Sequence, residues 1–143
     1  MKKLFLVVIA SFLAAGAAQA QGAATAVAWP AADMKWTPMV DGPPGAQAVT
    51  LWGDMTKGAY GAMLKFPAGF STPLHTHTSE MKLVVVSGTW IHTPEGKPSI
   101  RLGPGSYLLQ PGGNYRHTTA CDKASECLIF SESGGKFDLL PVK

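Results

Sequence analysis

The stretch that decides the fold is GFSTPLHTHTSEMKLVVVSG, residues 69–88. It places His75 and His77 two residues apart, ahead of an apolar, β-branched run that ends at Gly88. Side chains two apart on a β-strand point to the same face of the sheet, so these two imidazoles can converge. His117 adds a third imidazole from later in the chain. Because neutral imidazole is the commonest protein metal ligand, these three histidines are the first candidates for function.

The rest of the chain predicts short strands separated by turns. Beyond Gly45, turns containing Gly or Pro recur every ~6–12 residues, a spacing typical of β-sandwiches and barrels. No convincing amphipathic helix occurs after the first twenty residues, so we expect an all-β fold in a single domain. The predicted strands are 48–52, 60–66, 81–86, 89–93, 99–102, 106–110, 116–120 and 128–131, with short extended segments at 74–77 and 137–142.

Two motifs in this pattern resemble those of the cupin superfamily. In the first cupin motif, a glycine is followed after five residues by His-x-His, then by a glutamate and a second glycine, as in residues 69–88. In the second, a glycine is followed after five residues by Pro-x-Gly and then a histidine, as in residues 105–117. The resemblance implies a cupin-type β-barrel, a double-sheet jelly roll, over residues 46–143. Residues 21–45 are then expected to be an extended N-terminal lead-in.

The resemblance also implies a metal site inside the barrel. Carried over by position, its histidine ligands are His75, His77 and His117. The motif spacing puts Met81 where the family has its glutamate, and Glu80 stands one residue early. A shift of one residue turns a strand side chain to the opposite face, so Glu80 either points outward or is brought inward by a bulge. Glu80 and Met81 therefore both stay open as a fourth ligand.

These residues do not determine which metal ion binds or whether the site is catalytic. Three imidazoles can hold Zn, Cu, Ni or Fe, and open positions would remain for water or substrate. A thioether from Met81 would favour copper, whereas a carboxylate from Glu80 would suit Fe, Mn, Ni or Zn. Three functions follow: a metal-dependent enzyme acting on a small organic molecule, a non-catalytic sensor or scavenger of a small ligand or metal, and a purely structural barrel. The family resemblance adds a possible homodimer.

Other side chains could line the barrel. His92 follows Trp90 on the same face of a predicted strand and is a further possible ligand. Tyr107 and Tyr115 could line a ligand pocket, although aromatic core packing is the common alternative. Arg116 could bind a substrate carboxylate or lie on the surface.

Residues 1–20 have the pattern of a secretory signal peptide. Lys2 and Lys3 precede the apolar run 4–13, and Ala18-Gln-Ala20 fits a small-x-small cleavage site. We therefore expect a periplasmic or secreted protein with no membrane span after cleavage; the alternative is an uncleaved anchor. Without Lys2 and Lys3 the formal net charge falls from +3 to +1, and no basic patch predicts nucleic-acid binding.

The two cysteines, Cys121 and Cys127, are close in sequence. In an oxidising compartment such a pair is expected to form a disulfide. The polar residues 122–126 between them predict a hairpin-like tip clamped at its base. Two free thiolates acting as soft metal ligands are the alternative.

Overall fold

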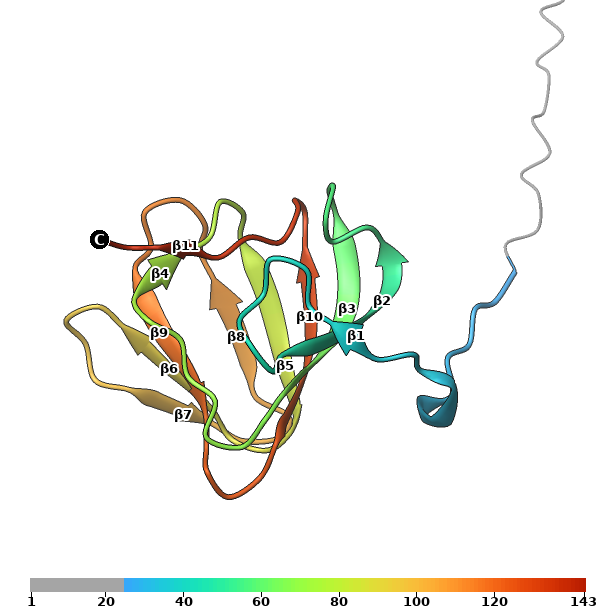
Figure 1. The fold of residues 1–143 in the computed structure, drawn as a ribbon, viewed down its shortest axis with the longest axis horizontal. Helices are drawn as coiled ribbons and strands as arrows, with labels where there is room; N and C mark the ends of the chain where they lie inside the picture. Colours follow the sequence, from blue (N-terminus) through green and yellow to red (C-terminus); the bar gives the residue numbers. More distant parts are fainter. Residues whose placement is uncertain (1–24) are drawn as a thin grey trace, which may run out of the picture.

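Two antiparallel β-sheets face each other across the interior of the molecule (Figure 1). The computed structural model describes residues 25–143, so the expected signal segment lies outside the described residues. The six-stranded sheet has the order β1 (Thr37–Pro38), β2 (Gln47–Gly53), β3 (Tyr60–Phe66), β10 (Cys127–Ser133), β5 (Met81–Ser87) and β8 (Tyr107–Gln110). The five-stranded sheet has the order β11 (Leu140–Pro141), β4 (His75–Thr76), β9 (His117–Cys121), β6 (Trp90–Pro94) and β7 (Ile100–Leu102).

This arrangement confirms the all-β prediction and the double-sheet jelly roll. Within residues 25–143, the helical structure is limited to one 3-10 turn, η1 (Ala31–Asp33). No helix in this part of the chain is long and apolar enough to cross a bilayer. Strand β1 lies in the segment expected to be an extended lead-in, and it pairs with β2 at the edge of the larger sheet.

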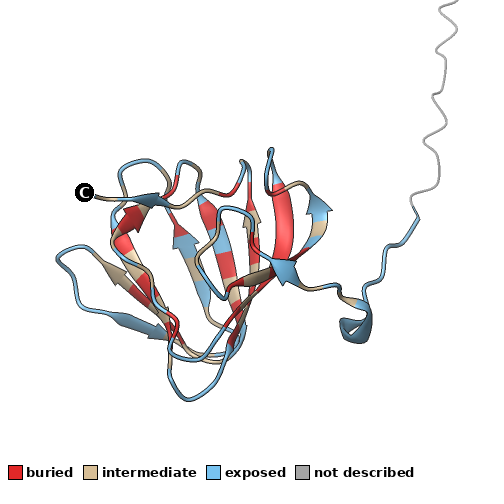
Figure 2. Cartoon of the chain, viewed as in Figure 1, coloured by how far each residue is buried: buried red, intermediate tan, exposed pale blue. Residues whose placement is uncertain are grey.

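Alternation of side chains along the strands builds the core between the sheets. In β5, Met81, Leu83 and Val85 point inward and are buried, whereas Lys82 and Val86 are exposed. Figure 2 shows the same banding on other strands, where buried and exposed residues alternate. Because strand side chains have a period of two, this alternation fixes which face of each strand meets the interior.

An aromatic cluster fills the interior near the end of β9. The ring centroids of Phe66 and Phe70, and those of Phe66 and Trp90, lie 4.8 Å apart. Trp90 pairs with Cys121, the last residue of β9, whereas His117 is the first residue of that strand. The aromatic cluster and His117 therefore lie at opposite ends of β9.

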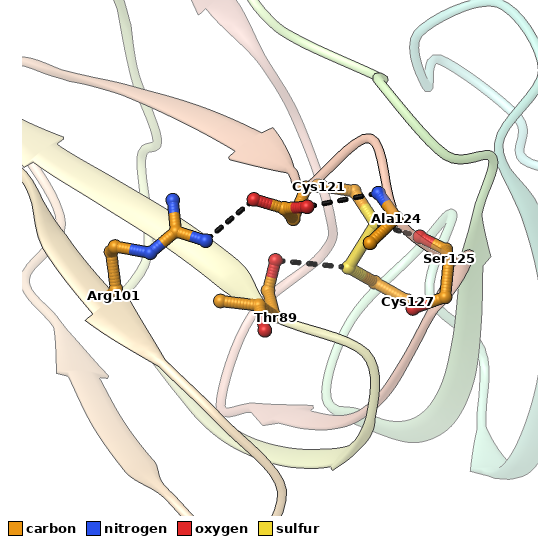
Figure 3. Close-up of a disulfide and its surroundings, with 7 residues drawn as sticks. Thr89, Arg101, Cys121, Ala124, Ser125 and Cys127 are labelled. Atoms are coloured by element: carbon orange, nitrogen blue, oxygen red, sulfur yellow. Dashed lines mark hydrogen bonds and ion pairs between the residues drawn. A yellow bond between two sulfur atoms is a disulfide. The ribbon is translucent and has the colours of Figure 1, made fainter.

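The disulfide Cys121–Cys127 is present, with a Cα–Cα distance of 5.8 Å (Figure 3). The prediction of a hairpin-like tip is wrong, because the strands on either side of the loop do not pair with each other. Cys121 ends β9 in the five-stranded sheet, and Cys127 begins β10 in the six-stranded sheet. The disulfide therefore ties the two sheets together. In the loop that follows Cys121, the Asp122 carboxylate accepts a hydrogen bond of 2.5 Å from the Arg101 guanidinium.

Candidate metal site

Three histidines converge at one end of the barrel. His75 in β4 lies opposite His117 in β9, and His77 follows β4 two residues after His75. Their ligand nitrogens all lie within 4.8 Å of one another. All three side chains are buried, with His117 fully so. The structure thus brings together the three histidines that the two motifs predicted.

Backbone carbonyls orient each of these rings. The Nδ1 atoms of His75 and His117 lie 2.9 Å and 3.2 Å from the carbonyl oxygens of Pro73 and Tyr115. The Nδ1 atom of His77 is hydrogen-bonded to the carbonyl oxygen of Asp138. A carbonyl oxygen can only accept, so each Nδ1 carries the proton and each Nε2 keeps its lone pair. This is the arrangement by which proteins orient metal-binding imidazoles.

The free Nε2 atoms are suited to a metal ion. The Nε2 atom of His117 is buried and has no hydrogen-bond partner among the described residues. A buried polar nitrogen without a partner carries a free-energy cost, which a metal ion on its lone pair would offset. The donor set of three imidazoles fits a borderline transition metal such as zinc.

Burial keeps these imidazoles neutral. Desolvation lowers the pKa of His77 to about 4 and the pKa of His117 to about 3. For His117 the charge of nearby His75 acts in the same direction. Desolvation also lowers the pKa of His75. Since the neutral form is the one that binds metals, the site is in its ligating state at neutral pH.

The structure separates the two candidates for a fourth ligand. The Glu80 side chain is exposed and does not join the histidine cluster. Met81 is only 5% exposed and lines the same interior cavity as His75 and His77. Its Sδ atom lies 3.8 Å from Nε2 of Gln110, the residue opposite it on β8. The position that holds the cupin glutamate therefore presents a thioether to the interior.

His92 and Tyr115 flank the cluster. His92 is buried, and its Nε2 atom lies 2.9 Å from the Tyr115 hydroxyl. The ring centroids of His92 and His117 are 4.9 Å apart, but His92 is not part of the group of converging ligand atoms. Tyr107 is instead exposed. Arg116 is also exposed and forms an ion pair with Glu95 at 3.1 Å, which places it on the surface.

Two contributors to the site did not emerge from the sequence. Gln110 is 2% exposed and lines the cavity beside Met81. The signal for it was available, because Gln110 is the polar end of an otherwise apolar strand just before Pro111. Asp138 acts on His77 through its backbone carbonyl, and its carboxylate accepts from the Thr78 backbone N–H at 2.9 Å. Every residue has a carbonyl, so no residue type could have marked it.

One curated relative shares part of the sequence. Dimethylsulfoniopropionate lyase DddQ of Ruegeria pomeroyi is 33% identical over 76 residues, which is 53% of this chain and 37% of that protein. The chain thus spans little more than a third of the length of this relative. In the crystal structure of the same lyase, the match covers 78% of this chain and 61% of the other, with 23% identity and a TM-score of 0.60.

Other solved structures share the fold at low identity. The polyketide cyclase RemF of Streptomyces resistomycificus matches with a TM-score of 0.66 and 18% identity, covering 83% of this chain and 87% of that one. A protein of Ralstonia eutropha with a cupin-like fold matches with a TM-score of 0.63 and 21% identity, covering 78% of this chain and 74% of that one. The family described as "Domain of unknown function (DUF4437)" matches residues 27–143. The chain therefore belongs to the DUF4437 family and has the fold of the cupin superfamily.

Proposed function

We propose that the protein binds one divalent transition-metal ion through the Nε2 atoms of His75, His77 and His117. The observation that carries this proposal is their convergence: three buried imidazoles within 4.8 Å, each held by a backbone carbonyl at its other nitrogen. A structural role alone would leave the buried Nε2 atom of His117 without a partner.

Metal content tests this proposal. The purified chain is loaded with excess zinc, desalted and analysed by mass spectrometry for metal and by quantitative amino-acid analysis. We expect about one zinc ion per chain, and loss of most of it in His75→Ala and in His117→Ala. His92→Asn is the matched control, because His92 is as buried as His75 but outside the cluster. Wild-type protein without zinc, or equal zinc in all variants, would contradict the proposal.

We further propose that the metal-loaded barrel acts on a small organic molecule. Three protein ligands leave coordination positions open, and an interior cavity adjoins His75 and His77. A bound ion would supply a Lewis acid for a substrate oxygen. The similarity to dimethylsulfoniopropionate lyase makes that compound the first substrate to test. Metal-dependent consumption of dimethylsulfoniopropionate by the wild type, absent in His117→Ala, would support a lyase activity.

A non-catalytic metal or ligand sensor is the second candidate. It is favoured by the missing carboxylate, since Met81 occupies the interior position and Glu80 is exposed. This candidate predicts tight metal binding with no turnover across a panel of small acids, esters and sugars. Metal-dependent turnover of any of them would exclude it.

We also propose that the protein is exported. The signal-like pattern of residues 1–20 and the disulfide Cys121–Cys127 both support this, because stable disulfides form in oxidising compartments. Expression in a bacterium followed by cell fractionation tests it. We expect a processed chain beginning at Gln21 outside the cytoplasm; an unprocessed cytoplasmic chain would contradict export.

A further inference from the structure

A β-bulge in β2 turns Trp52 onto the outer face of the six-stranded sheet. The pairing of β2 with β3 (Figure 1) is regular as far as Thr50, which faces Ala62, and then skips one residue, so that Trp52 lies opposite Gly61. Ala62 is buried in the interior, and successive positions of a strand alternate between faces, so Gly61 and Trp52 lie on the outer face. Without the bulge, Leu51 would stand opposite Gly61. Because bulges re-aim side chains, often next to functional sites, the orientation of Trp52 is a built feature of the sheet.

The indole of Trp52 lies flat across Gly61. A Cβ atom on Gly61 would fall within 2.8 Å of Trp52 Nε1 and of both carbon atoms bonded to it, Cδ1 and Cε2. A ring that approached with its N–H edge would hold these two carbons farther away, so the indole covers β3 with its face. Only glycine leaves room for this arrangement. The opposite face of the indole is left to solvent, and Trp52 remains 49% exposed.

A groove of about 490 Å³ borders the exposed indole. Besides Trp52, the side chains of Glu80, Lys82 and Glu132 line it. The Lys82 ammonium lies 3.2 Å from the Glu132 carboxylate, and Glu132 faces Gly61 across β10 and β3, which places this ion pair next to the indole. Glu80 forms no ion pair with residues 25–143. The volume falls in the range of small-molecule sites, about 300–1,000 Å³.

These groups suit a sugar ring. A pyranose with equatorial hydroxyls has two flat faces of axial C–H groups and a rim of hydroxyls that both donate and accept hydrogen bonds. Trp52 offers a flat apolar face to the C–H groups. At the rim, the Lys82 ammonium can donate, and the carboxylates of Glu80 and Glu132 can accept. An organic cation would also stack on an indole, but Lys82 would repel it, and the two carboxylates would repel an anion.

We propose that this outer groove binds a saccharide of β-linked, equatorial pyranose rings, with one ring stacked on Trp52 and its hydroxyls hydrogen-bonded to Lys82 and Glu132. The groove is separate from the barrel interior, because Lys82 is exposed on the outer face while its neighbour Met81 is buried on the inner face. The inference therefore goes beyond the proposed metal site and does not depend on it.

The indole N–H signals of the ¹⁵N-labelled chain provide the test. The probe is cellobiose, which consists of two β-linked glucose rings with equatorial hydroxyls. Two matched controls are sorbitol, which has the hydroxyls but no ring, and tetramethylammonium, a cation without hydroxyls. We expect cellobiose to shift the Trp52 signal in a saturable manner and to leave the Trp29 and Trp90 signals in place, with neither control shifting any signal. The Trp52 signal is identified by its loss in Trp52→Ala.

Substitutions then measure the contribution of the stacked ring. Trp52→Ala should weaken cellobiose binding at least ~10-fold, whereas Trp29→Ala, at a residue of similar exposure (47%) outside the groove, should not change it. Gly61→Ala keeps the indole but displaces it from β3, so it should also weaken binding. Gly58→Ala is its control, because no atom of residues 25–143 lies within 4 Å of a Cβ placed there.

Three results would overturn the inference. The first is a Trp52 signal that does not respond to cellobiose, which needs only the wild type. The second is a response to tetramethylammonium without one to cellobiose, which would make the groove a cation site. The third is a cellobiose affinity that is unchanged in Trp52→Ala or that depends on added zinc, since the sugar would then bind elsewhere or at the metal.

Discussion

His75 and His117 lie directly opposite each other on β4 and β9, and their ring centroids are 4.3 Å apart. Each residue belongs to a paired strand, and each ring is held by a carbonyl two residues earlier in the chain. The geometry of the pair is therefore set by the sheet before any ion binds. Such preorganisation lowers the cost of assembling a metal site.

Replacing Met81 by glutamate should restore a carboxylate to the site. The side chain at position 81 points into the cavity beside His75 and His77. Because carboxylate oxygen suits hard cations better than a thioether does, Met81→Glu should raise Mn²⁺ affinity at least ~10-fold in calorimetric titration. Glu80→Gln, on an exposed side chain, should change nothing. A loss of affinity in Glu80→Gln together with no gain in Met81→Glu would show that the register assigned to β5 is wrong.

The metal-free protein should lose stability on acidification from about pH 6.5, the ordinary histidine pKa. Burial holds the pKa of His77 at about 4 and that of His117 at about 3, so the unfolded chain binds protons that the folded chain does not. The free energy of unfolding therefore falls as pH falls, by up to about 1.4 kcal/mol per pH unit for each such histidine. Urea unfolding at pH 7.5, 6 and 5 measures this.

Asp54 titrates below the pH range in which the buried histidines affect stability. Hydrogen bonds from Thr56 and Lys57 lower the pKa of Asp54 to about 2, so its contribution to stability is lost only below about pH 4. A free energy of unfolding that is constant or rising between pH 7 and pH 5 would mean that the histidines are solvated, contrary to the structure.

Removing the disulfide should lower stability and spare the metal site. Cys121 and Cys127 are six residues apart in sequence, so the closed loop is short and its loss should cost about 2 kcal/mol on the chain-entropy model. The double variant Cys121→Ser with Cys127→Ser, unfolded in urea, measures the cost. Its zinc content should equal that of the wild type, because His117 lies at the other end of β9. Loss of zinc in this variant would instead point to the cysteines as ligands.

Gly88 should be intolerant of any side chain. Its φ is 78°, and a Cβ atom there would lie 2.4 Å from the Glu126 carbonyl oxygen and 2.9 Å from Cys127 Cα. Gly88→Ala should therefore destabilise the chain by at least ~2 kcal/mol. Gly96 has a similar φ of 69°, but no atom of residues 25–143 lies within 4 Å of a Cβ placed there, so Gly96→Ala carries only the backbone strain, about 1 kcal/mol. Equal losses of stability in the two variants would contradict this distinction.

Local patterns in the sequence were sufficient for most of the strands, whereas the three-histidine site was predicted from the resemblance to the cupin motifs. Residues 60–66 form β3 as predicted, and β5, β8 and β9 begin within one residue of their predicted starts. The strands and the alignment of His75 with His77 rest on short-range physics, namely β-branched runs, turn residues and the two-residue period of a strand, whereas His117 was assigned by its position in the second motif.

Long-range relationships were not accessible in the same way. The loop between Cys121 and Cys127 has the composition of a hairpin, yet it connects strands of different sheets. The choice between Glu80 and Met81 depended on the register in which Met81 faces Gln110. The hydrogen bond between His77 and the Asp138 backbone carbonyl joins residues 61 apart in sequence. Because every residue has a carbonyl, the identity of residue 138 could not have predicted this contact.

The most direct test of the metal site is the X-ray absorption spectrum of the zinc-loaded chain. We expect a coordination shell of three imidazole nitrogens at about 2.0–2.1 Å, completed by oxygen or by one thioether sulfur. In His75→Ala, loaded at a zinc concentration high enough to fill its weakened site, the imidazole count should fall by one, whereas in His92→Asn it should stay the same. A coordination shell of solvent and carboxylate oxygens, or one unchanged in His75→Ala, would contradict the claim that His75, His77 and His117 form the metal site.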